Sequence, residues 1–195
     1  NSAPLFSLVD PNASGFIYIN KLEEDKYFNI FSYQYAYNGS GVAVGDINND
    51  SLPDIFMGGN FIGGKLFLNK SNLTFENISK SAGVMQGGFS TGACMVDINA
   101  DGWLDIYICR SVAKEPDARR NVLLINNHNN TFTNKAKEFG LDDPGFSQNA
   151  AFFDYDNDGD LDMYLLNHRF DFPNATIIDK SFSQNKKELE FTSDK

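Results

Sequence analysis

Three short acidic segments with one shared pattern constrain the fold of this chain more than any other feature. Each reads D-x-[DN]-x-D-[GS]-x-x-D, and they cover residues 46–54, 97–105 and 154–162. Residues 65–69 also align with 122–126, and 75 aligns with 132, at an offset of 57. A period of this length predicts a protein built from repeated supersecondary units.

Short apolar runs flank every acidic segment and predict strands, so that each segment joins two strands of a hairpin. The 18 Phe and 8 Tyr among 195 residues suit strands packed face to face. The predicted strands are 41–45, 55–57, 65–69, 73–77, 93–96, 106–109, 122–126, 131–134, 150–153 and 163–166. About four strands in each repeat predict an all-β fold, a β-propeller with blades of four antiparallel strands.

The repeats divide the chain into four parts of one propeller domain. Residues 1–40 are expected to supply strands of a preceding or closing blade, followed by repeat 1 (41–91), repeat 2 (92–148) and an incomplete repeat 3 (149–195). Because propellers close with about 4–8 blades, these repeats predict a partial propeller or a fragment of a larger one. Open blade edges make self-association possible.

Each acidic segment offers a nearly complete cage of oxygen atoms. Side-chain oxygens stand at positions 1, 3, 5 and 9, and a main-chain carbonyl at position 7 can join them. Oxygen ligands alone favour Ca²⁺, up to three ions in all. The candidate ligands are Asp46, Asn48, Asp50, Leu52 and Asp54; Asp97, Asn99, Asp101, Trp103 and Asp105; and Asp154, Asp156, Asp158, Asp160 and Asp162.

The sixth position of each segment must turn sharply. Gly102 and Gly159 suit a positive φ there, whereas the first segment has Ser51, which predicts strain or a different shape. An EF-hand is excluded, because position 12 is Met57, Ile108 or Leu165 and not Glu. The remaining alternative is that these Asp and Asn side chains only form Asx turns.

Net charge, cysteine content and hydropathy argue against three classes: nucleic-acid-binding proteins, disulfide-framework proteins and proteins with a membrane-spanning helix. A net charge of −10 makes nucleic acid an unsuitable partner. Cys94 and Cys109 are too few for a disulfide framework, and two buried thiols are favoured over a single bridge. The sequence contains no apolar run long enough to span a bilayer.

Signs of catalysis are weak. The G-x-S-x-G match around Ser90 lacks the following helix of a nucleophile elbow. His128 lies in an Asn-rich turn, and His168 follows the third repeat; neither belongs to a recognisable triad. The ring of Trp103 is expected to pack on a neighbouring blade, or else to serve as a surface platform for a sugar.

The chain resembles the FG-GAP/VCBS repeat family, which includes the blades of integrin α-subunit propellers and bacterial proteins of the ASPIC/UnbV type. The resemblance rests on 41–46, 66–69, 82–84 and 154–164 and covers about residues 41–170. It implies a propeller with structural Ca²⁺ in each blade, located outside the cytoplasm.

The preferred function is a non-catalytic module at the cell surface, in the periplasm or secreted, as in bacterial members of the family. It is expected to bind a protein or polysaccharide partner or to act as a scaffold. The alternative is an accessory or partial domain of a carbohydrate-active enzyme whose catalytic residues lie outside this segment.

Overall fold

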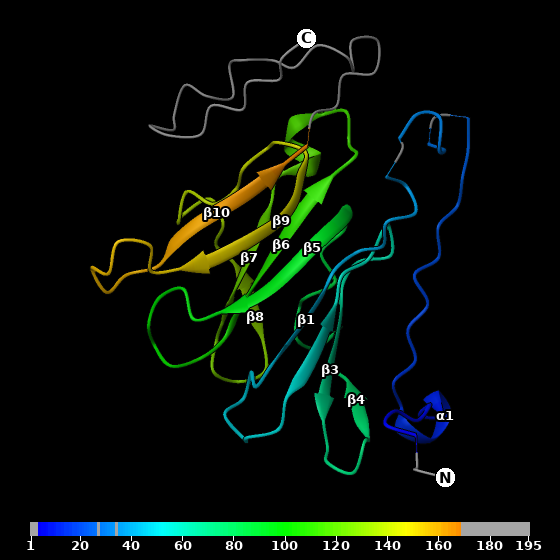
Figure 1. The fold of residues 1–195 in the computed structure, drawn as a ribbon, viewed down its shortest axis with the longest axis vertical. Helices are drawn as coiled ribbons and strands as arrows, with labels where there is room; N and C mark the ends of the chain where they lie inside the picture. The colour runs from blue at the N-terminus through cyan, green and yellow to red at the C-terminus, as the bar shows by residue number, and fades with distance from the viewer. Residues whose placement is uncertain (1–3, 27, 34, 169–195) are drawn as a thin grey trace.

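The computed structural model describes residues 4–26, 28–33 and 35–168, where nearly all regular structure is β (Figure 1). Two sheets have four strands each, in the orders β1-β2-β3-β4 and β5-β6-β7-β8, and a third pairs β9 with β10. The strands are β1 Val42–Gly45, β2 Asp54–Met57, β3 Lys65–Asn69, β4 Phe75–Asn77, β5 Phe89–Val96, β6 Asp105–Ser111, β7 Val122–Asn126, β8 Phe132–Asn134, β9 Ser147–Phe153 and β10 Asp162–Asn167.

The three sheets follow one another in chain order, and all neighbouring strands within a sheet are antiparallel. The first strands of the sheets are neighbours in space, since β5 contacts both β1 and β9 (Figure 1). This is the arrangement of blades in a β-propeller. The predicted all-β, partial-propeller fold is confirmed.

Glycine allows the first strands of the blades to approach closely. A Cβ on Gly41 would lie 2.6 Å from the main-chain nitrogen of Ala93, and a Cβ on Gly92 would lie 2.5 Å from the carbonyl oxygen of Gln148. Both distances are shorter than real Cβ contacts. Any side chain at these positions would therefore push neighbouring blades apart.

The core consists of two layers between the sheets. In β6, Ile106 and Ile108 face the first sheet, whereas Tyr107 and Cys109 face the third. Strand β7 alternates in the same way, and all five of its residues are buried. A strand buried on both faces reads as a continuous apolar run, which explains the pattern of the second repeat.

Both cysteines lie in the second core layer as free thiols, the state that the sequence favoured. Burial raises the pKa of Cys109 to about 12 and that of Cys94 to about 11. Both thiols therefore stay protonated at neutral pH.

The N-terminal stretch differs from the sequence prediction. Its described residues up to position 40 form a short helix, α1 (Pro11–Ser14), extended chain and turns, and no strand. Phe16 packs against Phe67, with ring centroids 4.4 Å apart. Further on, the side chain of Asn29 accepts hydrogen bonds from the N–H groups of Phe31 and Ser32. These local bonds hold a turn in place of a strand.

The boundaries of the other strands lie closer to those predicted from the sequence. Strands β5 and β9 begin earlier than predicted, and the insertion in the second repeat contains a 3₁₀ helix, Pro116–Arg119. The division into repeats stays a prediction, and the end of repeat 3 from residue 169 lies outside the described residues. Within the described part, no helix is both long and apolar enough to cross a membrane.

Candidate metal centre in the acidic loops

Each acidic loop joins the first two strands of its sheet at the same register. Gly45 pairs with Asp54, Val96 with Asp105, and Phe153 with Asp162. Positions 4 and 6 of all three loops have positive φ angles. These are Asn49 (58°) and Ser51 (69°), Ala100 (56°) and Gly102 (85°), and Asn157 (61°) and Gly159 (94°). The loops therefore share one backbone conformation. Ser51 adopts the same positive φ as Gly102 and Gly159, so the first loop does not take the different shape that was the alternative to strain.

The carboxylate at position 1 turns into its own loop. In every loop one oxygen accepts the N–H of position 5 and the other accepts the N–H of position 6. The donor–acceptor distances are 3.2 and 2.7 Å for Asp46, 3.0 and 2.8 Å for Asp97, and 3.2 and 3.1 Å for Asp154.

The carboxylate at position 9 closes the loop from the other side. It accepts the N–H of position 2 at 3.0 Å in Asp54, 3.1 Å in Asp105 and 2.8 Å in Asp162. Asp54 and Asp105 have no exposed surface. Burial raises the pKa of Asp105 to about 6 and also raises that of Asp54. A cation beside these carboxylates would favour their charged form.

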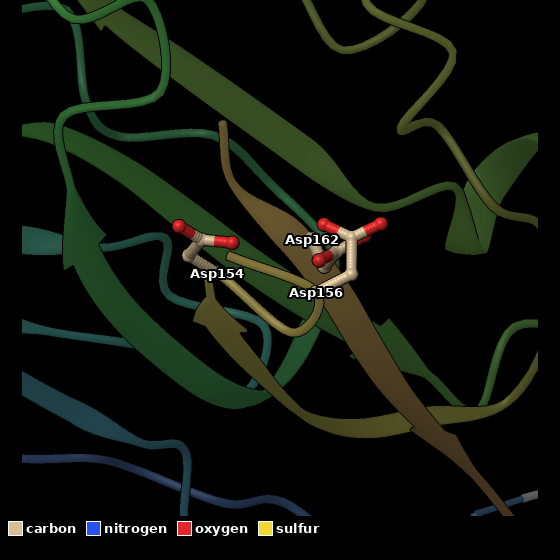
Figure 2. Close-up of side chains that lie close together, drawn as sticks. All are labelled: Asp154, Asp156 and Asp162. Atoms are coloured by element: carbon tan, nitrogen blue, oxygen red, sulfur yellow. The ribbon is translucent and has the colours of Figure 1, made fainter. Parts of the chain in front are cut away.

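The third loop gathers its carboxylates most closely. Asp154, Asp156 and Asp162 each present an oxygen, and these oxygens all lie within 4.8 Å of one another (Figure 2). In the same loop, a hydrogen bond with Asp158 and repulsion from its charge raise the pKa of Asp160. Like charges crowd here, and a divalent cation would relieve the repulsion.

The first two loops carry Asn at position 3, so each has one carboxylate fewer than the third loop at positions 1, 3, 5 and 9. There the Nδ2 of Asn48 donates to Asp50 at 3.0 Å, and that of Asn99 donates to Asp101 at 2.8 Å. Position 5 also accepts the N–H of position 7 in every loop, namely from Leu52, Trp103 and Asp160. The position-7 residues are thus held at the loop, while their role as carbonyl ligands stays a prediction.

These donor atoms fit Ca²⁺. All are oxygens, from carboxylates, amides or the main chain, and hard cations such as Ca²⁺ take six to eight of them. The bound ion would supply positive charge at the centre of each loop. Binding at the predicted ligand residues stays a prediction.

Sequence reasoning missed several side chains that contact the loops, among them Asn69, whose Nδ2 donates to the carbonyl oxygen of Pro53 at 2.9 Å. Asn126 donates from Nδ2 to the carbonyl oxygens of Ile47 (2.8 Å) and Leu104 (3.1 Å), which joins the loops of two sheets. The Nδ2 of Asn49 donates to Gly102 at 3.1 Å. His128 contacts Asp101 at 2.9 Å. Of these, Asn69 and Asn126 carried a sequence signal, because they match at the offset of 57.

The sequence motif around Ser90 does not form a nucleophile elbow. Ser90 lies inside strand β5 and is buried, whereas an elbow places its serine on a turn between a strand and a helix. A different serine, Ser111, lies 3.2 Å from Nε2 of His168, but it has no exposed surface. A substrate therefore has no access to its hydroxyl group.

The fold and the loops together define a class of protein: repeats of a four-stranded propeller blade, each with an acidic loop between its first two strands. Comparison with known families agrees. The FG-GAP-like repeat model matches residues 46–108 and 111–165, more than half of the chain. The chain belongs to the FG-GAP-like repeat family, as the sequence predicted.

The chain is also similar, along most of its length, to a known protein. Cartilage acidic protein 1 of Xenopus tropicalis is 34% identical over 146 residues, which cover 70% of this chain. The chain spans 21% of the length of that protein.

Proposed function

We propose that this chain is a non-catalytic, calcium-binding β-propeller module of the extracellular space, which binds a protein or polysaccharide partner or acts as a scaffold. The observation that carries this proposal is the threefold repetition of one loop geometry. All three loops have positive φ at positions 4 and 6 and the same inward-turned carboxylates at positions 1 and 9. This repetition supports one shared role for the three loops, and oxygen ligands at the same positions favour a bound cation.

Calcium would act as a structural ion. Each loop connects the first two strands of a blade, so an ion held by positions 1 and 9 would tie both strand ends together. It would also neutralise carboxylates that otherwise repel one another. The loops would then gain the rigidity that a binding surface requires.

The proposed location rests on the relative. That protein is named for cartilage and for its acidity, and this chain is acidic as well, with a net charge of −10. An acidic surface suits partners with basic groups.

Thermal unfolding in EDTA, in Ca²⁺ and in Mg²⁺ tests the proposal. A ligand that binds only the folded state raises its stability, so we expect Ca²⁺ to raise the melting temperature well beyond Mg²⁺. Asp101→Ala and Asp158→Ala should each remove part of this gain. If EDTA changes nothing, the loops are Asx turns without an ion and the proposal is wrong.

Self-association is a second candidate property. Val42 and Val44 on the first sheet are 53% and 60% exposed, and Phe153 and Leu166 on the third sheet are 44% and 48% exposed. Exposed apolar sheet faces favour contact with other chains.

A further inference from the structure

The second acidic loop has a contact that the other two loops lack in the described residues. His128, on the turn between β7 and β8, places Nε2 at 2.9 Å from Oδ2 of Asp101. Its ring also stacks on Trp103, with centroids 4.9 Å apart and planes 19° apart. Trp103 belongs to the same loop as Asp101, so His128 contacts this loop at two residues. The ring of Trp103 thus stacks within its own blade, whereas packing on a neighbouring blade was the sequence-based expectation; its use as a surface platform for a sugar stays a prediction.

The position of His128 is itself well defined. Its main-chain N–H donates to Oδ1 of Asn126 at 2.9 Å, and its φ angle is 63°. Asn126 is buried and is bound in turn to carbonyl groups of two loops. The main chain at His128 is therefore held in place by a hydrogen bond to a buried side chain.

These contacts restrain the carboxylate of Asp101. Oδ1 accepts the N–H of Trp103 at 2.9 Å, and Oδ2 faces both Asn99 (2.8 Å) and His128 (2.9 Å). Both oxygens of Asp101 are therefore hydrogen-bonded, which fixes the rotation of its carboxylate.

The first loop provides an internal comparison. Asp50, at the same loop position, accepts bonds from Leu52 and Asn48. The residue that matches His128 at the offset of 57 is Ser71, and no contact joins it to Asp50 in the described structure.

We propose that His128 is a positioning residue for a cation in the second loop: it holds the Asp101 carboxylate in its binding orientation before the ion arrives. This rests on the proposed calcium binding. Within the described residues, Oδ2 of Asp101 faces both Asn99 and His128, whereas Oδ1 accepts only the N–H of Trp103. A carboxylate oxygen has two lone-pair sites, so Oδ1 still has one to offer an ion. Partners that orient a ligand in this way typically change metal affinity about 10- to 100-fold.

The single tryptophan gives a readout specific to this loop. Tb³⁺ is a hard, oxygen-seeking ion of nearly the size of Ca²⁺, and Trp103 can sensitise its luminescence only at short range. We would titrate Tb³⁺, then displace it with Ca²⁺, exciting where Trp absorbs and Tyr does not. His128→Ala should raise the Tb³⁺ dissociation constant about 10-fold, and likewise the Ca²⁺ dissociation constant calculated from the displacement curve and the Tb³⁺ value. His128→Gln, which retains an N–H donor, should restore part of the loss.

Ser71→Ala is the matched control and should leave the Trp103 signal unchanged. Urea unfolding of each variant in EDTA shows whether it is folded. If folded His128→Ala binds Tb³⁺ and Ca²⁺ with the wild-type dissociation constants, the positioning role is wrong. If the wild type itself shows neither Tb³⁺ luminescence nor Ca²⁺-dependent stabilisation, the proposed calcium function fails first.

Discussion

Single residues set the backbone of the acidic loops. Positions 4 and 6 lie in the left-handed region, which costs a residue other than Gly or Asn roughly 1–2 kcal/mol. Two loop residues adopt this unfavourable conformation: Ser51, at φ 69°, and Ala100, at φ 56°. The third loop, with Asn157 and Gly159, has suitable residues at both positions.

Replacing Ser51 by Gly should therefore stabilise the protein. We expect a gain of about 0.5–1 kcal/mol, the relieved strain less the extra chain entropy of glycine in the unfolded state. For a protein of this size that corresponds to about 1–4 °C in melting temperature. Calorimetry in EDTA measures it without interference from bound ions. Ser51→Ala, which keeps the strain, should show no gain, and an equal gain in both variants would contradict this explanation.

The same positions show how far sequence reasoning extends. Spacing alone predicts the ligand positions and the sharp turn at Gly102 and Gly159, because these depend on neighbours within one loop. The left-handed turn at Ala100 was not predictable, since alanine carries no turn signal. The contact of His128 with Asp101 joins residues 27 apart, and it depends on how the β7–β8 turn folds back.

At the scale of elements, the decisive feature is how one blade is tied to the next. Asn126, at the end of β7, donates to Ile47 in the first loop and to Leu104 in the second. Its main-chain N–H also donates to Asp105 at 2.8 Å. Asn69, the matching residue of β3, donates to Pro53 of its own loop. Of the bonds that Asn69 and Asn126 make in the described structure, only the one from Asn126 to Ile47 spans two blades.

The strands themselves were easier to predict than the N-terminal stretch. The apolar runs of β3 and β7 carry enough signal because both of their faces are buried. The aromatic run 28–37 is also typical of a strand. There, however, the side chain of Asn29 bonds the main chain locally, and Phe28 and Tyr33 pack in a separate cluster with Phe89. Such competition between a local turn and a strand is not visible in the pattern of residue types.

Asn126→Ala should be clearly more destabilising than Asn69→Ala. The first change leaves the carbonyl groups of Ile47 and Leu104 without their donor, and we expect a loss of about 2–3 kcal/mol. The second removes the bond to Pro53 and the bond from the N–H of Ser71, both at exposed sites, and a loss of about 1 kcal/mol or less should result. Urea unfolding of both variants in EDTA makes the comparison. Equal losses would show that Asn126 acts within its own blade and does not tie the two blades together.

At the largest scale, that of the described residues taken together, the faces that blades bury between them are exposed on the first and third sheets. Val42 and Val44 of β1 match Ala93 and Met95 of β5 in the repeat, and those two residues pack against the first sheet. On the third sheet, Leu166 faces away from the neighbouring blade and is 48% exposed. The exposed face of the first sheet thus corresponds to the face that β5 packs against the first sheet within the chain. The exposed face of the third sheet is the one on which a further blade would pack.

This asymmetry predicts head-to-tail association of separate chains, in which the third sheet of one chain packs on the first sheet of the next. Sedimentation equilibrium should show a mass that rises with protein concentration. A buried charge at either face is costly, so Val44→Glu and Leu166→Glu should each abolish association. Leu73→Glu, at an exposed turn between β3 and β4, is the control and should leave it intact. If only one of the two face variants is monomeric, the contact joins two like faces and closes as a dimer, because a head-to-tail contact needs both faces in every copy.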